Sequence, residues 1–224
     1  MYLVRIDAAG NKVWEQRFSN GSNWSSRGNA VTRSGDGGFV VAGYTGTVLY
    51  SVYKELYLLK VDGSGNLVWE RKFGSTGRDE AFAVIHTQDN GFLIAGNAGS
   101  GVYVVTVDSS GNRVREHSYE QFFLQGAACV AATSSGVEYL FGGYLYVPAT
   151  IGIPGHYDMY LLKPSWGDSW MRHFVWGGPG DDMISGICRL ADGKYMVVGT
   201  TGSYGTGGPN IYLMKIDENG EFAE

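Results

Sequence analysis

Two pairs of adjacent carboxylates are the residues of this chain best suited to chemistry. Asp79 with Glu80 and Asp181 with Asp182 each follow a glycine-rich run. Oxygen atoms from two such segments can bind Ca²⁺, which prefers carboxylate and carbonyl ligands. Two carboxyl groups at a suitable separation can also serve as the acid and base of a glycosidase. The sequence therefore allows a calcium site at these four residues, with hydrogen bonding inside their own turns as the alternative.

Other catalytic patterns are missing from the sequence. The four histidines lack metal-ligand spacing, and the two cysteines do not form a Cys-x-x-Cys pair. Neither a Gly-x-Ser-x-Gly elbow nor a phosphate-binding loop occurs. Where the carboxylate pairs stand, two other repeats carry Arg27-Gly28 and Gly126-Ala127, so half of a carboxylate ring would be absent. We expect a protein that is not an enzyme and has no cofactor other than possible Ca²⁺.

Aromatic side chains form a second set of candidate functional residues. Flat rings can stack on sugar rings or on a protein partner at little cost in side-chain entropy. The alternative is that these rings pack the loops down onto the rest of the fold. The residues that we expect to bind a ligand are Trp24, Tyr44, Tyr53, Tyr144, Tyr146, Tyr157 and Tyr204.

All these residues lie in or beside copies of a repeated strand pattern. A tyrosine opens the pattern at positions 2, 57, 103, 160 and 212, and a Gly-aromatic-aliphatic stretch such as residues 38–43 recurs between copies. Short apolar runs bounded by glycines are typical of strands, and a strand-only period of about 50 residues indicates a propeller. The predicted fold class is all-β: a β-propeller of four-stranded antiparallel blades, about four or five in number, in a single domain over residues 1–224.

Residues 80–119 show the predicted strands of one blade: 80–87, 92–96, 102–108 and 113–119. The third and fourth strands are joined by Asp-x-x-Gly, in which the aspartate bonds ahead to backbone amides and the glycine takes a left-handed conformation. The chain holds one more third strand than second strands, which leaves the blade number and the closure of the ring open.

Loop lengths suggest where binding resides. Turns from first to second and from third to fourth strands are short, whereas connections such as 45–56, 145–158 and 200–210 differ in length. Variable loops on a rigid scaffold are common binding sites. We therefore place the function on the face that carries these variable loops.

Composition excludes several kinds of partner. The formal net charge is −5 and the pI is about 5.4, so we expect no nucleic-acid partner. No run of 18 apolar residues occurs, so we expect no membrane insertion.

Cys129 and Cys188 are predicted to be small buried residues rather than a disulfide. The first residues lie in a strand pattern and lack the features of a signal peptide.

Two motifs resemble known propeller families. The pattern Asp-x-x-Gly-x-x-x-Trp, at residues 7–14 and 62–69, resembles the tryptophan-docking pattern of quinoprotein-like propellers. Residues 38–45, 74–80 and 177–182 are similar to the bacterial and archaeal β-propeller repeat family. Arg115 departs from the pattern where a docking tryptophan would stand. The resemblance implies a secreted or cell-surface protein with a binding or scaffold role, and it carries over no catalytic residues.

These observations lead to three functional hypotheses. The first is a non-catalytic module that recognises carbohydrate or a surface polymer through the variable-loop face. A structural element for protein–protein interaction in a larger assembly, with a possible homo-oligomer, is the alternative. A polysaccharide-acting glycosidase or lyase that uses Asp79 and Asp181 is the third. The expected partner is thus a glycan or a protein, and the cellular location stays unknown.

Overall fold

The structure is a computed structural model, which describes residues 1–18, 24–47, 53–74, 77–99, 101–119, 124–136, 138–164 and 171–223. Within these ranges the chain forms seventeen strands and no helix. No helical span suited to crossing a bilayer is therefore found in the described residues.

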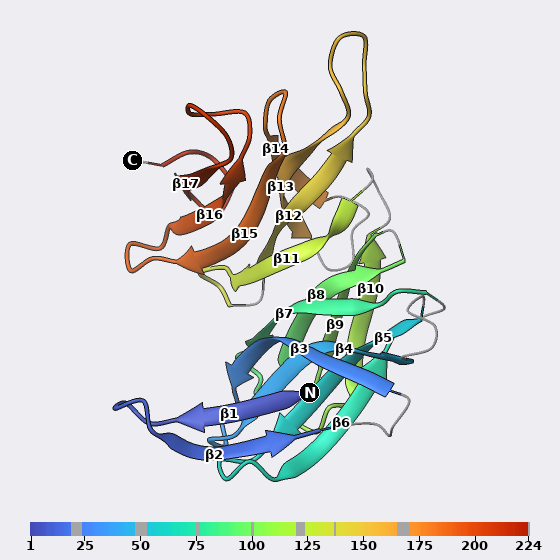
Figure 1. Ribbon diagram of the computed structural model, residues 1–224. Coiled ribbons are helices and arrows are strands. Elements are labelled where there is room, and N and C mark those ends of the chain that lie inside the picture. Colours follow the sequence, from blue (N-terminus) through green and yellow to red (C-terminus); the bar gives the residue numbers. More distant parts are fainter. Residues whose placement is uncertain are drawn as a thin grey trace. The chain divides into compact units, whose positions relative to one another are not determined.

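Strands that are consecutive in the chain pair with each other, so each sheet is one continuous run of sequence (Figure 1). The N-terminal sheet is a hairpin of β1 (Tyr2–Ile6) and β2 (Lys12–Arg17). The next sheet contains β3 (Trp24–Arg33), β4 (Phe39–Thr47), β5 (Lys54–Val61) and β6 (Leu67–Phe73). The following sheet contains β7 (Glu80–His86), β8 (Phe92–Ala98), β9 (Gly101–Val107) and β10 (Arg113–Tyr119). The third four-stranded sheet contains β11 (Leu124–Ala132), β12 (Tyr139–Val147), β13 (His156–Pro164) and β14 (Met171–Trp176).

The C-terminal sheet contains β15 (Asp182–Arg189), β16 (Tyr195–Thr201) and β17 (Asn210–Ile216). A single antiparallel bridge from Ile216 to Phe222 begins a fourth strand. The predicted fold class is confirmed, because the chain is an all-β propeller built from antiparallel blades. In the blade taken as the example, every strand ends within two residues of its prediction.

The chain divides into two compact units, each of which is described by itself. The first unit comprises Met1–Gly99 with Val104–His117, and the second comprises Ser100–Tyr103 with Ser118–Glu224. The prediction of a single domain over residues 1–224 stays a prediction.

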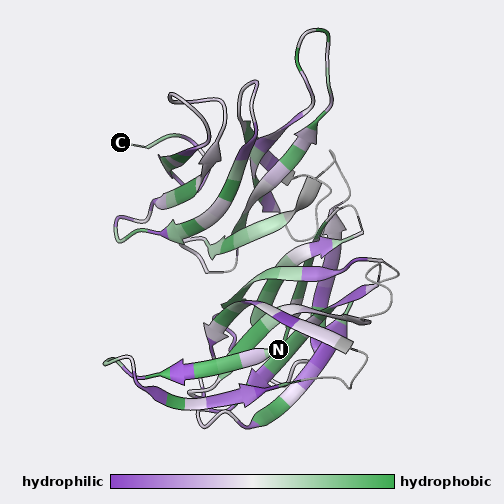
Figure 2. Cartoon of the chain, viewed as in Figure 1, coloured by the Kyte–Doolittle hydropathy of each residue, from purple (hydrophilic) through white to green (hydrophobic). Residues whose placement is uncertain are grey.

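Inner strands are apolar on both faces, as expected for strands covered on both sides. In β5 every residue from Leu56 to Val61 is buried. Figure 2 shows the same contrast in another blade, where β9 is largely hydrophobic and the outer strand β10 is largely hydrophilic. Most residues of the outer strand β10 are exposed, which accounts for its polar composition.

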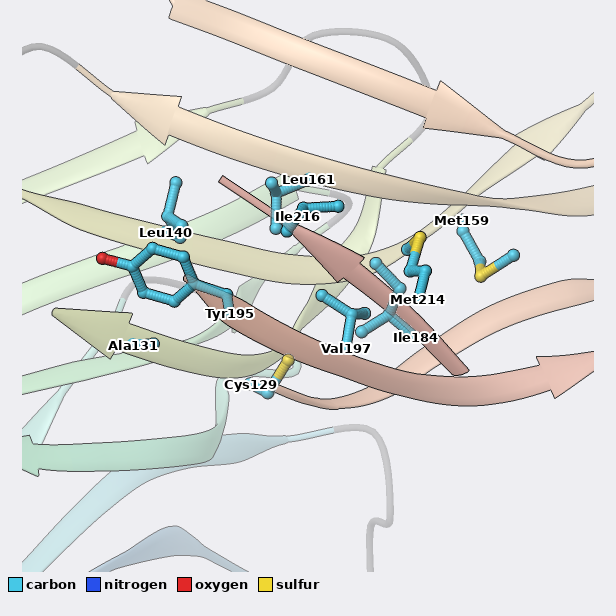
Figure 3. Packing of buried hydrophobic residues seen from close by; sticks show 10 residues of the cluster. All are labelled: Cys129, Ala131, Leu140, Met159, Leu161, Ile184, Tyr195, Val197, Met214 and Ile216. Atoms are coloured by element: carbon cyan, nitrogen blue, oxygen red, sulfur yellow. The ribbon is translucent and has the colours of Figure 1, made fainter. Parts of the chain in front are cut away.

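The core of the second unit is formed by side chains from β11 to β17 (Figure 3). Tyr195 and Val197 on β16 face inward with Met214 and Ile216 on β17, and Ile184 on β15 joins them. The remaining members of this cluster are Cys129, Ala131, Leu140, Met159 and Leu161.

The Asp-x-x-Gly turns have the predicted geometry. Asp62 Oδ1 accepts the backbone N–H groups of Ser64 at 2.8 Å and Asn66 at 2.9 Å, and Gly65 has a φ of 88°. Only glycine reaches this left-handed conformation without a steric cost at Cβ. The equivalent aspartates make the same bonds in the other turns, which begin at Asp7, Asp108 and Asp217.

In the first unit, a tryptophan side chain of one sheet bonds to a turn of the next sheet at two places. The indole N–H of Trp14 donates to the Gly63 carbonyl at 3.0 Å, and that of Trp69 donates to the Ser109 carbonyl at 3.1 Å. In the second unit the ring of Phe174 takes this place and lies against Gly220. The sequence search for tryptophan missed Phe174.

The cysteine prediction is half right. Both cysteines are free, and Cys129 is buried in the core. Burial raises the pKa of the Cys129 thiol to about 12, so it stays protonated at neutral pH. Cys188 is exposed, contrary to the prediction, because it lies opposite Met196 on the uncovered face of β15–β17.

Candidate functional site

Three of the predicted ligand-binding tyrosines lie together on the second unit. Tyr146 on β12 is directly opposite Tyr157 on β13, with ring centroids 5.4 Å apart. Tyr144 lies two residues earlier on β12, and its ring centroid is 5.5 Å from that of Tyr157. Alternate residues of a strand share a face, and opposite residues of paired strands are neighbours. We call Tyr144, Tyr146 and Tyr157 the tyrosine cluster; Tyr146 is its exposed member.

The other face of β13 at this end carries His156 and Asp158. Their side chains approach to 3.6 Å, from His156 Nε2 to Asp158 Oδ1. Burial raises the pKa of Asp158; His156 acts in the opposite direction, and the carboxylate of Asp182 adds to the rise. Asp158 Oδ1 is buried and accepts no hydrogen bond from the described residues. A buried carboxylate oxygen with an ion-pair contact but no hydrogen bond among the described residues thus lies at this end of β13.

Gly177 leaves the space that this carboxylate occupies. A Cβ atom on residue 177 would lie 1.9 Å from Asp158 Oδ1, so any side chain at this position would displace the carboxylate. The glycine-rich run before β15 therefore has a steric function here, in addition to forming a turn.

Asp181 and Asp182, two of the predicted calcium ligands, make hydrogen bonds within the second unit. Asp182 Oδ1 accepts the hydroxyl of Thr201, and its Oδ2 accepts the hydroxyl of Ser203 at 2.5 Å and the N–H of Gly178 at 3.0 Å. Asp181 Oδ1 accepts the backbone N–H of Tyr157 at 3.0 Å. The Asp181 bond ties the start of β15 to the strand that carries the tyrosine cluster.

Asp79 and Glu80, the other two predicted ligands, lie in the first unit. The N–H of Asp79 donates to the Lys54 carbonyl at 2.9 Å, and its side chain is completely buried. Glu80 accepts from Lys54 Nζ at 2.6 Å and from Asn29 Nδ2 at 3.0 Å. The Glu80 carboxylate is thus neutralised by a lysine and is not an open metal ligand.

Within the described residues, no group of three or more histidine, cysteine or carboxylate side chains is arranged to hold a metal ion. The four predicted ligands also fall in two different units. The calcium site stays a prediction.

Tyr204, a further predicted binding residue, lies in the loop between β16 and β17. Its ring stacks on Tyr212 with centroids 5.6 Å apart and planes 27° apart. Its hydroxyl donates to the Gly177 carbonyl at 2.8 Å, and the residue is 46% exposed. Tyr204 therefore presents a ring that is fixed by a stacking contact and by a hydrogen bond.

The remaining three predicted aromatics lie in the first unit. Tyr44 lies in the first unit with Lys54 Nζ 3.7 Å from its ring centroid, so one face of the ring is covered. Tyr53, also in the first unit, is exposed. Trp24 begins β3, and its side chain lies outside the described part of the structure.

A cavity of about 710 Å³ lies on the first unit, at the short turns rather than at the variable loops. Its walls include Trp69, Arg71 and a 2.7 Å ion pair between Lys60 Nζ and Asp36 Oδ2. A hydrogen bond from Lys60 and the N–H of Gly38 lower the pKa of Asp36 to about 2. Sequence reasoning missed this cavity, although Lys60 was a signal, because it is a charged residue within a buried apolar run.

The blades define the chain as a β-propeller protein. Comparison of the sequence with models of known protein families and with curated protein sequences found no match.

Proposed function

We propose that this propeller is a non-catalytic module that binds carbohydrate or a surface polymer through the tyrosine cluster and Tyr204 of the second unit. The observation that carries the proposal is the exposed ring of Tyr204, which is fixed by Tyr212 and by the Gly177 carbonyl. A ring that is already held in place loses little entropy when a ligand stacks on it. The proposed binding surface comprises residues 144–157 and Tyr204, all of the second unit.

Sugar recognition requires both a flat apolar surface and hydrogen-bonding groups. Tyrosine rings supply the surface for the C–H face of a pyranose, and their hydroxyls remain available for polar contacts. Asp158 lies on the opposite face of β13 and its Oδ1 is buried, so it is not part of this surface.

One further observation favours binding over catalysis at this site. Both oxygens of Asp182 are occupied by the Thr201 and Ser203 hydroxyls and by the Gly178 N–H. A carboxylate engaged in this way is poorly placed to act as a nucleophile or base. The resemblance of residues 38–45 to bacterial and archaeal propeller repeats supports a secreted or cell-surface location.

The test is a screen of the purified chain against a panel of immobilised polysaccharides and oligosaccharides, followed by variants on any ligand that binds. Tyr204→Ala and Tyr146→Ala should each weaken binding about tenfold, which corresponds to about 1.4 kcal/mol. Tyr204→Phe keeps the ring but loses the bond to Gly177, so it should weaken binding less.

Tyr2→Ala is the matched control, because Tyr2 is an exposed tyrosine of the other unit and is not among the predicted binding residues. Its binding should equal that of the parent chain. The proposal is overturned by a panel without any binding, or by equal binding of the Tyr204→Ala and Tyr146→Ala variants and the parent.

A further inference from the structure

The cavity of about 710 Å³ beside Lys60 is formed by residues of the first unit alone, so no residue of the other unit is needed to build it. Its walls come from β5, from β6 and from the short turns that follow β3, β7 and β9. Small-molecule sites usually have volumes of about 300–1,000 Å³. The cavity can therefore hold a ligand larger than an inorganic ion.

Lys60 brings a buried positive charge to the cavity. It lies within the apolar strand β5, and its side chain is 7% exposed. Its Nζ lies 2.7 Å from Asp36 Oδ2, its ionic partner among the described residues. An ammonium group has further N–H donors beyond the one that Asp36 accepts. Lys60 can therefore donate to a second acceptor placed in the cavity.

Arg71 brings a second positive charge in a fixed position. Its Nη2 donates to the Ser110 carbonyl at 2.9 Å, and its guanidinium carbon lies 5.6 Å from the centre of the Trp69 ring. Its Nη1 donates to the Glu70 carbonyl at 2.8 Å. A guanidinium group has more N–H donors than the two used here, in a planar arrangement that matches a carboxylate. Arg71 is thus held by backbone carbonyls and still has donors for a ligand.

The preceding hairpin shows that this position does not need a positive charge to fold. Gln16 occupies it there, and its Cγ lies against Gly65 as the Cγ of Arg71 lies against Gly111. Each of these glycines belongs to an Asp-x-x-Gly turn. The packing on the turn therefore uses the aliphatic part of either side chain, and the charge of Arg71 is left to serve the cavity.

Asn90 lines the cavity at a conformational cost. Its φ is 61°, a left-handed value that glycine adopts more easily than asparagine. Glycine occupies the corresponding place in the turns at Gly37, Gly136 and Gly193. The Asn90 side chain reaches the neighbouring turn, where a Cβ atom on Gly35 would lie 3.1 Å from its Oδ1. Unfavourable backbone conformations are often kept at functional sites, and this one places an amide at the cavity wall.

The charges of the walls favour an anion. Lys60 and Arg71 carry two positive charges and Asp36 carries one negative charge, which leaves an excess of one positive charge. Asp108 interacts electrostatically with Arg71 but lies outside the walls, and its oxygens accept N–H groups of its own turn. One carboxylate on a ligand would balance the excess and accept charge-assisted hydrogen bonds from both cations.

The other groups of the walls suit a hydroxylated ligand. The neutral polar groups are the hydroxyls of Ser34, Ser109 and Ser110 and the side-chain amide of Asn90. Such groups both donate and accept hydrogen bonds, as the hydroxyls of a sugar also do. The exposed side chain of Val68 adds an apolar surface for the C–H groups of a sugar ring.

We propose that this cavity binds a uronate, with Arg71 and Lys60 on its carboxylate and Asn90 with the serine hydroxyls on its ring hydroxyls. The uronate can be a free sugar acid or one residue of an acidic polysaccharide, since both present the same chemical group. The cavity shares no residue with the tyrosine cluster or Tyr204. It is a site independent of the one proposed on the second unit.

The test is titration calorimetry of the full chain with galacturonate and, separately, with polygalacturonate. Binding of galacturonate identifies the free sugar acid as a ligand, and binding of the polymer alone identifies the polysaccharide; either result supports the site. Galactose and methyl-esterified polygalacturonate are the uncharged counterparts. They should bind about tenfold more weakly or not at all, because they lack the charge-assisted hydrogen bonds.

Three variants locate the binding in this cavity. Arg71→Gln introduces the residue of the preceding hairpin and should weaken binding about tenfold. Asn90→Gly introduces the residue of the other turns and should weaken binding about threefold without loss of stability. Asp36→Asn should strengthen binding, because it removes a negative charge and leaves Lys60 to the ligand. Unfolding can only weaken binding, so the opposite signs of Arg71→Gln and Asp36→Asn separate recognition from loss of structure.

Arg113→Gln is the matched control, because Arg113 is an exposed arginine of the same unit outside the cavity walls. It should bind as the parent chain does, and equal circular dichroism spectra establish that all variants are folded. The proposal is overturned if neither uronate binds, or if the uncharged counterparts bind as tightly as the acids. Parent-like binding by Arg71→Gln or by Asp36→Asn overturns it as well.

Discussion

The indole ring of Trp14 lies over Gly65 so closely that a Cβ atom on residue 65 would come within 3.0 Å of the ring. The same relationship joins Trp69 to Gly111, also at 3.0 Å. Contacts below about 3.4 Å between carbon atoms are repulsive, so both sites require a residue without a side chain. The glycine of each turn thus allows the backbone to turn and also leaves room for the ring of the preceding sheet.

The first prediction separates these two effects of glycine. Gly10 has the same left-handed φ as Gly65, 85° against 88°, but nothing lies near the position of its Cβ. Gly10→Ala should therefore cost only the conformational penalty of about 1 kcal/mol. Gly65→Ala adds a collision with Trp14 and should cost about 1–3 kcal/mol more, as overpacking does. Urea unfolding of both variants gives the two free energies.

A Trp14→Ala background supplies the control for this comparison. Removing the ring should make the cost of Gly65→Ala approach that of Gly10→Ala. Equal costs for the two glycine substitutions in the parent chain would contradict the steric role of the indole.

The second prediction concerns acid stability and the ion pair of Lys60 with Asp36. The pKa of Asp36 falls from 3.8 to about 2 on folding, because the carboxylate accepts hydrogen bonds from Lys60 and from the Gly38 N–H. A lowered pKa stabilises the folded state above pH 3.8, and this stability is lost as the pH falls toward 2. Asp36→Asn should lower stability at pH 7 and reduce its decline between pH 4 and 2.

Chemical unfolding at several pH values measures this effect. Water partly screens the pair, since the Asp36 side chain is 55% exposed. Lys12→Met, which removes the exposed partner of Glu15, is the control and should change stability little. A decline between pH 4 and 2 that is as steep in Asp36→Asn as in the parent would refute the assignment.

The third prediction concerns Asp158, whose pKa shifts in the opposite direction. Burial raises its pKa in the folded chain, so the folded state prefers the protonated carboxyl. The stability that this group contributes is present below its unfolded pKa and is lost as the pH rises through the folded value. Asp158→Asn removes the charge and should raise the melting temperature at pH 7, but change it less at pH 4.

Asp7→Asn is a suitable comparison, because hydrogen bonds from Asn11 lower the pKa of Asp7 in its exposed turn. This substitution should lower the melting temperature at pH 7, opposite in sign to Asp158→Asn. A loss of stability in Asp158→Asn at pH 7 would show that the ionised carboxylate is favoured in the fold.

Local patterns predicted the fold because each strand pairs with its neighbour in sequence. The turn that begins at Asp62 needs only its own five residues to form, so its geometry could be read from the chain. The docking role of Phe174 was missed for the opposite reason. Its partner Gly220 is 46 residues away, and a search for tryptophan does not detect a phenylalanine that fills the same space.

The candidate site was predicted in part. The tyrosine cluster depends on the register between β12 and β13, which places Tyr146 opposite Tyr157 and is not encoded in either strand alone. The contact of Lys54 with the Tyr44 ring joins the paired strands β4 and β5, and it could not be predicted from residue type. The cavity beside Lys60 depends on turns from separate strands that only the packed structure brings together.

Pairing of each strand with the next one along the chain has a consequence for folding kinetics. Each sheet closes only short loops as it forms, so its entropic barrier is low. Any blade can then nucleate, and its neighbours can add to it one after another. Amide protons in β8 and β9, the inner strands of a four-stranded sheet, should exchange by rarer openings than those of the two-stranded hairpin β1–β2. The number of strands in a sheet therefore affects how readily that sheet opens.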